Sequence, residues 1–397
     1  MRVVLSTYGS RGDVEPLVAL AVRLREGGAQ VRVCAPPDFA GRLGEVGVAF
    51  VPVGVSAREL TVAAPGPSSL PERAARAVAS QVAAVTEAAR GYDVVVATGM
   101  LPSAAGALSV AEKLGIGAVS VTFQQLTLPS PHHRPLAYPG RPFPPGLTDN
   151  RELWRLDAEN INTLFGAALN TNRASIGLPP VDDVRDYVIG ERPWLASDPV
   201  LDPCDLDVVQ TGAWTLPDER PLPDELTAFL DAGDPPVYLG FGSMPLHGST
   251  DAAQVTIEAI RAHGHRVVLS RGWADLALTD AADDCFVVGE VNHQALFARV
   301  AAVAHHGGAG TTTTAARAGA PQVVVAQLAD QPHWAGRVAA LGIGAAHEGP
   351  TPTVESFSAA LATALAPETR ARASAVAATV RADGAEVAAN LLTLGGS

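Results

Sequence analysis

The chain has 397 residues, 47% of them hydrophobic and 17% charged, with no low-complexity segment. This length exceeds what one hydrophobic core usually holds, so two globular domains are expected. The formal net charge of -13 argues against a nucleic acid or an anionic membrane as a partner, because both are bound mainly through an excess of Lys and Arg.

Cysteine usage and hydropathy indicate the compartment. Cys34, Cys204 and Cys285 are far apart and lack the spacing of a zinc site, which is typical of a reduced protein rather than of a disulfide framework. No segment approaches the roughly 18 uninterrupted apolar residues of a membrane helix, and the N-terminus turns polar too early for a signal peptide. We therefore expect a soluble, cytoplasmic protein without a bound metal.

The first half of the chain alternates short apolar runs with helical patterns. Residues 3–6, a glycine-containing loop, a helical pattern from residue 15 and a second apolar run at residues 31–35 predict a β-α-β unit. Further strands are expected at residues 50–53, 93–98, 118–123, 194–196 and 208–211, and helices at residues 73–89, 103–114 and 149–175. This alternation predicts a parallel sheet covered by helices on both faces.

Residues 124–146 break the pattern with prolines and aromatic residues. A long irregular segment inside a compact domain is usually functional or disordered. His132 and His133 lie in it, where exposed polar side chains are the simpler interpretation of the two histidines.

Residues 216–223 predict an interdomain linker, because their prolines and charges cannot continue a buried strand. The alternation then restarts, with strands expected at residues 237–240, 266–270, 286–288, 302–304 and 322–326 and helices at residues 252–262, 294–300 and from residue 356 onward. Two α/β halves with a cleft between them are therefore predicted.

The most informative stretch is residues 305–314, which read His-His-Gly-Gly-Ala-Gly-Thr-Thr-Thr-Thr after an apolar run. This pattern predicts a strand that ends in a glycine-rich turn opening a helix. Free backbone N–H groups and the positive end of the helix dipole would face the turn, and glycine lets an oxygen-rich group approach closely. The expected ligand is a phosphate or diphosphate.

Other polar or glycine-containing loops also follow predicted strands, at residues 9–13, 242–244, 270–273, 289–292 and 330–331. Ligands of open α/β sheets bind outside the carboxyl ends of the strands, so this clustering indicates a site more strongly than any single loop does. A lone glycine loop could also reflect only tight helix packing, which is the less favoured interpretation.

Two common nucleotide-binding motifs are excluded. A Walker loop needs a lysine, and the one lysine of the chain, Lys113, lies outside any glycine-rich loop. A dinucleotide fingerprint needs G-x-G-x-x-G and an acidic residue about 20 positions later, but the loop at residues 9–12 has the wrong spacing and the second strand ends in Cys-Ala-Pro. NAD and FAD are therefore not expected.

His305 and His306 are adjacent on a strand end and point to opposite faces, so only one of them can face a cleft. No Cys or carboxylate accompanies them at a spacing useful for zinc. One histidine is expected to donate a hydrogen bond to phosphate, and the other to pack or to satisfy a core carbonyl.

Asp13 is the candidate general base, and two interpretations of it stay open. An Asp at the start of a helix is commonly a capping residue, which is a sufficient reason for its presence. Alternatively, its carboxylate projects into the cleft opposite the phosphate site. Ser10 and Arg11 share its loop, and Arg11 could contact ligand oxygens or cover the rim.

The sequence resembles inverting, nucleotide-sugar-dependent glycosyltransferases of the GT-B fold, and most of all the actinobacterial enzymes that glycosylate vancomycin- and teicoplanin-type heptapeptide aglycones. The resemblance covers essentially the whole chain. It rests on residues 9–16, 34–37, 170–180, 210–214, 240–243, 305–312 and 330–332.

The resemblance implies a role for each matching residue. Asp13 would be the general base on the acceptor hydroxyl. The donor would be bound by Ser10, Arg11, Gly12 and Ser243 near its phosphates, by Trp273 and Val291 at the nucleobase, by His305, His306, Gly308, Ala309, Gly310, Thr311 and Thr312 around the diphosphate, and by Asp330 and Gln331 at the sugar hydroxyls. Candidates for contact with the acceptor are His132, His133, Tyr138 and Phe143.

The fold implied by the resemblance is α/β, with two Rossmann-like parallel-sheet domains facing across a cleft. An acceptor domain is expected at residues 1–214, a linker at 215–224, a donor domain at 225–380 and a C-terminal helix at 381–397 that packs back on the first domain. Donors would be dTDP- or UDP-sugars, without another cofactor, and the acceptor a glycopeptide aglycone or pseudoaglycone. A monomer is expected. The intact Gly307-Gly308 and Asp330-Gln331 pairs favour an ordinary hexose or N-acetylhexosamine over a deoxyaminosugar.

Two other functions remain open. One is a nucleotide-sugar epimerase of the same fold, against which the aromatic, proline-rich segment 124–146 speaks. The other is a non-catalytic nucleotide-sugar-binding protein, which the intact Asp13 and the intact motif at residues 305–312 disfavour.

Overall fold

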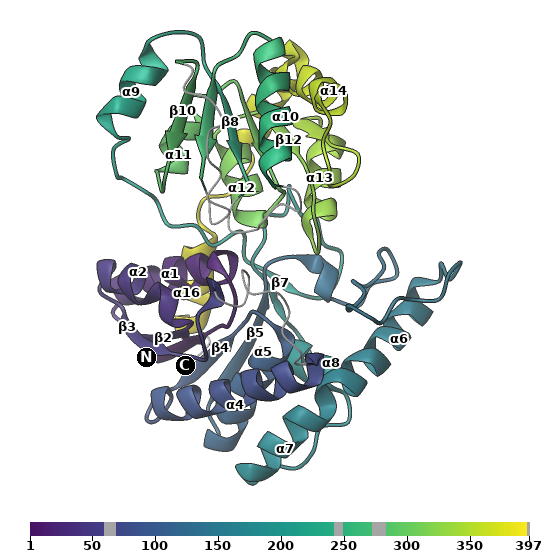
Figure 1. The fold of residues 1–397 in the computed structure, drawn as a ribbon. Helices are drawn as coiled ribbons and strands as arrows, with labels where there is room; N and C mark the ends of the chain where they lie inside the picture. Colours follow the sequence, from purple (N-terminus) through teal and green to yellow (C-terminus); the bar gives the residue numbers. More distant parts are fainter. Residues whose placement is uncertain (59–68, 242–248, 272–282, 395–397) are drawn as a thin grey trace. The chain divides into compact units, whose positions relative to one another are not determined.

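The computed structural model describes residues 1–58, 69–241, 249–271 and 283–394 (Figure 1). The chain forms two compact units. Unit 1 comprises Met1–Ser197, Cys204–Leu216 and Ala382–Ser397, and unit 2 comprises Asp198–Pro203 and Pro217–Arg381. The short segment Asp198–Pro203 thus leaves unit 1 and joins unit 2 well before the rest of that unit begins.

Unit 1 is built on a seven-stranded parallel sheet in the order β3-β2-β1-β4-β5-β6-β7. Its strands are β1 (Arg2–Ser6), β2 (Gln30–Ala35), β3 (Ala49–Pro52), β4 (Val94–Ala97), β5 (Gly117–Thr122), β6 (Trp194–Leu195) and β7 (Val209–Gln210). Val3, Val4 and Leu5 of β1 are all fully buried, as expected of a strand with both faces covered.

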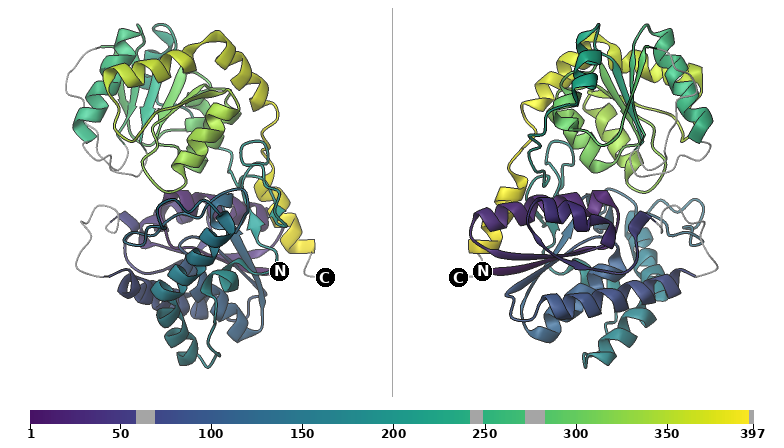
Figure 2. Two further views of the ribbon diagram at one scale, coloured as in Figure 1. Left: turned by 90° about the vertical axis from the view of Figure 1, so that its right-hand side faces the viewer. Right: turned by 60° about the vertical axis from the view of Figure 1, so that its left-hand side comes forward.

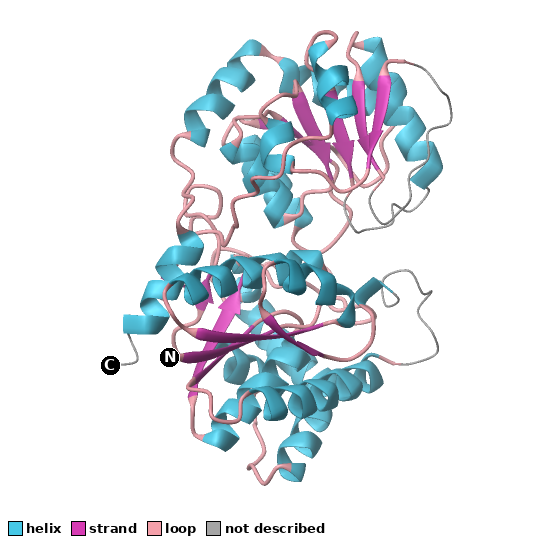
Figure 3. Ribbon diagram, turned by 90° about the vertical axis from the view of Figure 1, so that its left-hand side faces the viewer, coloured by secondary structure: helices cyan, strands magenta, loops and turns pink. Residues whose placement is uncertain are grey.

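Helices cover both faces of this sheet (Figure 3). They are α1 (Arg11–Glu26), α2 (Ala40–Glu45), α4 (Leu70–Ala88), α5 (Leu101–Leu114), α6 (Asn150–Ile161), α7 (Ala167–Ser175), α8 (Val184–Ile189) and α16 (Gly384–Leu394), with short 3-10 turns η1 (Pro37–Phe39) and η2 (Gln125–Thr127) and a π-helical stretch η3 (Asn162–Gly166).

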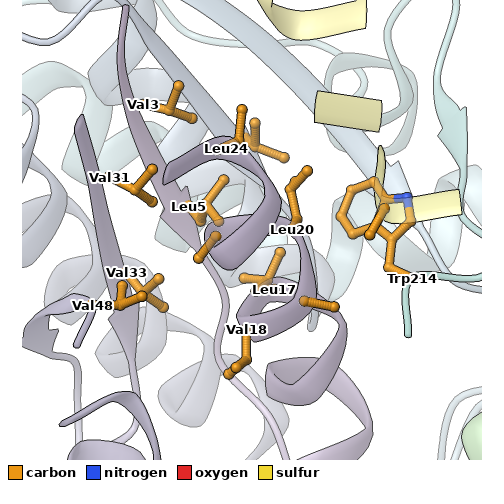
Figure 4. Packing of buried hydrophobic residues seen from close by; sticks show 14 of the residues in the cluster. Val3, Leu5, Leu17, Val18, Leu20, Leu24, Val31, Val33, Val48 and Trp214 are labelled. Carbon is orange, nitrogen blue, oxygen red and sulfur yellow. The ribbon is translucent and has the colours of Figure 1, made fainter. Parts of the chain in front are cut away.

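One core layer of unit 1 lies between the sheet and α1. Leu17, Leu20 and Leu24 recur at helical spacing on the buried face of α1 and pack with Leu5 and Trp214 (Figure 4). The C-terminal helix α16 joins the same cluster and lies beside α1 (Figure 2). The other layer packs β1 and β4 against α4, α5 and α7.

Unit 2 contains a six-stranded parallel sheet in the order β10-β9-β8-β11-β12-β13. Its strands are β8 (Val237–Gly240), β9 (Val267–Ser270), β10 (Cys285–Val288), β11 (Ala302–His305), β12 (Gln322–Val324) and β13 (Gly344–Ala346), and its helices are α9 (Asp224–Asp231), α10 (Ser249–Ala262), α11 (His293–Phe297), α12 (Ala309–Arg317), α13 (Gln331–Ala340), α14 (Val354–Leu365) and α15 (Pro367–Ala377). Helices again lie on both faces of the sheet (Figure 2). The prediction of two parallel α/β halves is confirmed.

Individual elements differ from the sequence predictions in a few places. Helix α1 begins at Arg11 rather than near residue 15, so Asp13 lies in its first turn. The single helix expected over residues 149–175 is interrupted by η3. Strand β13 was not predicted, because Gly-Ala-Ala lacks β-branched residues, yet a Cβ at Gly344 would come within 2.0 Å of the Gln322 carbonyl oxygen. Glycine is required there for β13 to approach β12.

Among the described residues, no helix combines the length and the apolar character needed to span a membrane. None of the three cysteines, Cys34, Cys204 and Cys285, is paired in a disulfide within the part of the chain that the structure describes. Residues 211–223, which include the predicted linker, form neither helix nor strand.

Candidate functional site

Each sheet has a topological switch point, where consecutive strands extend the sheet in opposite directions. In unit 1 this point lies between β1 and β4, and in unit 2 between β8 and β11. Ligands of such sheets bind outside the carboxyl ends of the strands at the switch point. The loop that leads from β1 into α1 and the turn that leads from β11 into α12 both lie there.

Asp13 is tied to the start of its own helix. Its Oδ2 accepts a hydrogen bond from the Ser10 amide at 2.8 Å, in the manner of a capping box with Ser10 at the N-cap. The carboxylate lies directly over Gly9, where a Cβ would come within 2.1 Å of Oδ2. Asp13 therefore makes the contact that a capping residue is expected to make. The contact fixes the orientation of the Asp13 carboxylate, which can accept hydrogen bonds from more than one donor.

The other loop residues have local roles as well. Arg11 is partly exposed, and its Nε lies 3.7 Å from Glu15 Oε1. Arg42 binds the same Glu15 carboxylate, with Nε 3.1 Å from Oε1. Gly12 is exposed, and a Cβ there would meet nothing closer than Ser10 Oγ at 3.9 Å.

His305 is fully buried, and both of its ring nitrogens are used inside unit 2. Nδ1 accepts a hydrogen bond from the Gly307 amide at 3.0 Å, so Nε2 carries the proton and donates to Gln322 Oε1 at 2.9 Å. Burial lowers the pKa of His305 to about 3. No ring nitrogen of His305 is left for a ligand. The expectation that His305 contacts the diphosphate directly is therefore corrected, and His305 instead stabilises the turn.

His306 differs from its neighbour. Its Nδ1 is buried and has no hydrogen-bond partner among the described residues. Its ring lies over Gly308, where a Cβ would come within 2.6 Å of Nε2. Burial lowers the pKa of His306 to about 4, so the imidazole is neutral and can donate one hydrogen bond. A buried nitrogen without a partner calls for an explanation, and an anion bound at the adjacent helix N-terminus would provide one.

Helix α12 begins directly after this turn, with Gly308 at its N-cap. Ala309, Gly310 and Thr311 are its first three residues, whose amides have no acceptor within a helix. Three backbone N–H groups are therefore available at the predicted anion site. Thr312 does not join them, because its amide and its hydroxyl both donate to the Gly308 carbonyl at 3.0 Å and the residue is buried.

Asp330 and Gln331 form a corner at the start of α13. Asp330 is the N-cap residue, and its Oδ2 accepts from Trp334 Nε1 at 2.8 Å. Burial raises the pKa of the Asp330 carboxyl. Gln331 Oε1 accepts from the Gln327 and Leu328 amides at 2.7 and 3.2 Å, which closes the preceding loop.

The chain is strained at this corner. Ala329 has φ of 56°, and it is the one non-glycine residue with positive φ among those that the structure describes. A left-handed conformation costs alanine roughly 1–2 kcal/mol. Such strain persists where surrounding contacts determine the backbone, which is frequent at ligand sites.

The turn and the corner pack against each other. Gly307 has φ of 92°, and a Cβ there would lie 3.1 Å from the Gln331 carbonyl oxygen and 2.8 Å from Val324 Cγ1. Glycine at position 307 therefore permits both the turn and its contact with the corner. The structure brings His306, the first turn of α12 and the Asp330-Gln331 corner together in one region of unit 2.

The expected nucleobase contacts are only partly described. Val291 is half-buried in the loop after β10 and packs against a core cluster. Its neighbour Asn292 caps α11 and donates to the Asp218 and Arg220 carbonyls at 2.7 and 2.8 Å, which anchors the predicted linker. Ser243 and Trp273 lie outside the described residues.

The four acceptor candidates do not share an environment. Phe143 is buried, and the Tyr138 ring packs on Phe165 at 5.4 Å between centroids. Burial raises the pKa of Tyr138. His132 is exposed and lies 2.9 Å from Asp205, whereas the ring of His133 packs on Trp154. Phe143 and Tyr138 therefore have contacts that serve the fold.

Sequence reasoning missed two residues that hold the site in place. Gln322 fixes the ring of His305, and Trp334 binds Asp330. A glutamine inside an apolar strand is a detectable signal, because a buried amide needs a partner. The described part of the chain contains no group of three or more His, Cys, Asp or Glu side chains that could hold a metal ion.

Two segments of the chain match known protein families. Residues 3–127 match the N-terminal domain of glycosyltransferase family 28, and residues 255–394 match the C-terminal domain of the erythromycin biosynthesis protein CIII-like family.

Similar proteins include three from Amycolatopsis orientalis. The glycosyltransferase GtfE is 59% identical over 99% of this chain and 97% of its own length. The vancomycin aglycone glucosyltransferase is 58% identical over the same shares. The dTDP-epi-vancosaminyltransferase is 53% identical over 95% of this chain and 93% of its own length.

Solved structures share the fold at lower identity. The glycosyltransferase of kitacinnamycin superposes with a TM-score of 0.74 at 22% identity, covering 99% of this chain and 98% of that one. The glycosyltransferase VinC, solved in complex with dTDP, gives a TM-score of 0.67 at 21% identity and covers 99% of both chains.

Proposed function

Since the chain belongs to the vancomycin-type glycopeptide glycosyltransferases, which have the GT-B fold, we propose that it transfers a sugar from a dTDP- or UDP-sugar to a hydroxyl of a heptapeptide aglycone or pseudoaglycone. The transfer inverts the anomeric carbon and uses no metal. This activity would serve the biosynthesis of a glycopeptide antibiotic.

The donor diphosphate would bind at the N-terminus of α12. The amides of Ala309, Gly310 and Thr311 offer three donors, and the helix dipole adds positive potential at the same point. His306 would donate a further hydrogen bond to a phosphate oxygen. The observation that carries this assignment is the buried, unpartnered Nδ1 of His306 beside that open helix end.

The donor sugar would bind at the corner of α13. Asp330 accepts from Trp334 through Oδ2, and its carboxylate has further accepting capacity for sugar hydroxyls. Gln331 uses Oε1 for the loop, and its Nε2 has no acceptor among the described residues, so its amide hydrogens suit a hydroxyl oxygen. One relative of the chain is named for transfer of glucose and another for transfer of epi-vancosamine, so the relatives are consistent with an ordinary hexose and with a deoxyaminosugar. We favour an ordinary hexose or N-acetylhexosamine as the donor sugar.

Asp13 would act as the general base. Its carboxylate would accept the proton of the acceptor hydroxyl while that oxygen attacks the anomeric carbon and the diphosphate departs. The amides of α12 and His306 would stabilise the charge that develops on the diphosphate. A phenol, with a pKa near ~10, is an easier proton donor than an aliphatic alcohol, which favours a phenolic hydroxyl of the aglycone.

The test is a mass-spectrometric screen of dTDP- and UDP-sugars against heptapeptide aglycones and pseudoaglycones. Transfer is expected as a mass gain of one sugar on the acceptor, with release of the nucleoside diphosphate. Incubation with donor alone provides the control. An epimerised donor without acceptor would identify an epimerase, and donor binding without product across the panel would identify a binding protein.

A further inference from the structure

The segment Asp198–Pro203 belongs to unit 2 although the chain on both sides of it belongs to unit 1. Leu201 is buried in a cluster with Trp334 and Val338 of α13. Arg337 donates from Nε to the Leu201 carbonyl at 2.8 Å and from Nη2 to the Val200 carbonyl at 3.2 Å. The segment is therefore docked along one side of α13.

Asp198 gives the segment its shape. Its Oδ1 accepts from the Val200 and Leu201 amides at 2.8 and 3.2 Å, and its Oδ2 accepts from the Arg381 amide at 2.7 Å. The Asp202 amide donates to the Asp198 carbonyl at 2.7 Å. These bonds form a compact turn that presents the side chain of Asp202 to the helix.

Asp202 has no solvent exposure and makes a close contact with α13. Its Oδ1 lies 2.8 Å from His333 Nε2, and the His333 side chain is 17% exposed. Burying a carboxylate costs free energy unless the carboxylate is paired. Loss of the contact with His333 would therefore leave Asp202 buried at a high cost in free energy. The pair fixes the position of His333 relative to the segment.

His333 lies in the first turn of α13, next to the corner formed by Asp330 and Gln331. Its amide donates to the Asp330 carbonyl at 3.0 Å. The following residue, Trp334, donates to the same carbonyl at 3.2 Å and from Nε1 to Asp330 Oδ2. The path from Asp202 to the Asp330 carboxylate thus runs through one histidine and one turn of helix.

We propose that Asp202, acting through His333, is a positioning residue for recognition of the donor sugar. The corner contains the left-handed Ala329, and strained backbone keeps its conformation only where contacts on several sides determine it. Gln331 secures the loop side of the corner, and the pair of Asp202 with His333 secures the helix side. The amides that would bind the diphosphate belong to α12 rather than to α13, so the proposal places the effect of this pair on the sugar.

The proposal rests on the proposed function of the corner, and it separates two parts of the donor. Replacing Asp202 by Ala is expected to weaken binding of an intact nucleotide sugar by about 10-fold to 100-fold, because a misplaced Asp330 carboxylate would lose charge-assisted hydrogen bonds to sugar hydroxyls. Binding of the free nucleoside diphosphate, which lacks the sugar, is expected to stay at the wild-type level. Asp202→Asn keeps an oxygen acceptor for His333 Nε2 and is expected to bind both ligands like the wild type.

The experiment measures dissociation constants by calorimetry for dTDP-glucose and dTDP, or the corresponding uridine pair, with the full-length protein. Asp284→Ala serves as the control, because it removes another carboxylate of unit 2 that forms a two-pronged pair with Arg261 at 2.8 and 2.7 Å, away from α13. This control is expected to leave the ratio of the two constants unchanged. If Asp202→Ala does not fold, His333→Ala removes the same contact and is expected to give the same selective loss.

An equal loss for both ligands, or no loss for either, would overturn the positioning role of Asp202. A failure of the proposed function is recognised separately in the wild type, where neither ligand would bind or no sugar would be transferred in the mass-spectrometric screen.

Discussion

Nδ1 of His305 accepts a hydrogen bond from the amide of Gly307 at 3.0 Å. This single contact decides which of the two adjacent histidines can meet a ligand. With Nδ1 occupied, the other nitrogen must carry the proton, and it donates to Gln322. His305 is thereby held inside unit 2 as a brace of the turn, and the neighbouring His306 keeps a buried nitrogen without a described partner.

Replacing Gln322 by Met tests this role of His305. The substitution keeps the volume but removes the acceptor of the His305 Nε2 proton, so a buried donor is left unsatisfied at a cost of about 1–3 kcal/mol. We expect a lower free energy of unfolding in urea and weaker binding of the nucleoside diphosphate, because the turn loses its fixed histidine. Unchanged stability and binding would show that the tautomer of His305 is irrelevant to the turn.

Gly308 is expected to be sensitive to a single methyl group. A Cβ at this position would lie 2.6 Å from His306 Nε2, so Gly308→Ala must displace the imidazole from the turn. We predict weaker binding of the nucleoside diphosphate, measured by calorimetry, with a correctly folded protein. Gly336→Ala in α13 is the control, because its Cβ would meet no atom within 4 Å and alanine is favoured over glycine in a helix by about 1 kcal/mol. Equal effects of the two substitutions would contradict the assigned position of His306.

Acid should destabilise the protein through the same two histidines. Burial lowers the pKa of His305 to about 3 and that of His306 to about 4, so the unfolded chain binds more protons than the folded one below the ordinary pKa of 6.5. The contribution of these two groups to the free energy of unfolding is therefore fully present above that pH. It is lost as pH falls toward 4, by about 3 kcal/mol per histidine at pH 4.5.

Urea unfolding at pH 6.5 and pH 4.5 measures this loss. His306→Gln is expected to lose less stability between the two pH values than the wild type, since it lacks one of the two groups. Asp157 acts in the opposite direction, because burial raises its pKa to about 6, and the comparison between variant and wild type removes its contribution. A variant with the full acid sensitivity of the wild type would contradict the burial of a neutral His306.

The parallel sheets could be predicted because their strands are continuous apolar runs separated by helical periods. Strand β13 escaped prediction because its close approach to β12 depends on the missing side chain of Gly344, a contact between chain segments that local propensity does not encode. The alternation along a strand correctly implied that His305 and His306 differ. It could not tell which one faces inward, because the partner Gln322 lies 17 residues later in the chain.

The irregular segment 124–146 shows a second limit of sequence reasoning. Its length and irregularity indicated a functional or disordered segment, and the resemblance implied that Tyr138 and Phe143 contact the acceptor. In the structure Phe143 is buried and Tyr138 packs against Phe165, so the same residues stabilise unit 1. Tyr138 packs against a core cluster that contains Phe165 and Leu169, a tertiary contact that has no local signature.

Stability measurements distinguish these roles. Phe143→Ala is expected to lower the free energy of unfolding by roughly 3 kcal/mol, as for other buried aromatic residues. His132→Ala is expected to leave stability unchanged, because His132 is exposed and its contact with Asp205 lies at the surface. If Phe143→Ala raised only the KM for the acceptor without a loss of stability, the aromatic ring would belong to the acceptor site after all.

Asp13 gives the most direct test of the proposed chemistry, because its two interpretations predict different results. Asp13→Asn keeps an oxygen that can accept from the Ser10 amide, so the helix cap is preserved. Glu72→Gln is the matched control, since Glu72 holds the equivalent position in the capping box of α4.

The decisive measurement is the turnover of Asp13→Asn with saturating nucleotide sugar and aglycone. As general base, Asp13 predicts a fall of roughly 10²–10⁴-fold in kcat with donor binding retained, and no change in Glu72→Gln. Turnover of Asp13→Asn at the level of the wild type would show that this carboxylate only caps its helix, and the proposed mechanism would fail.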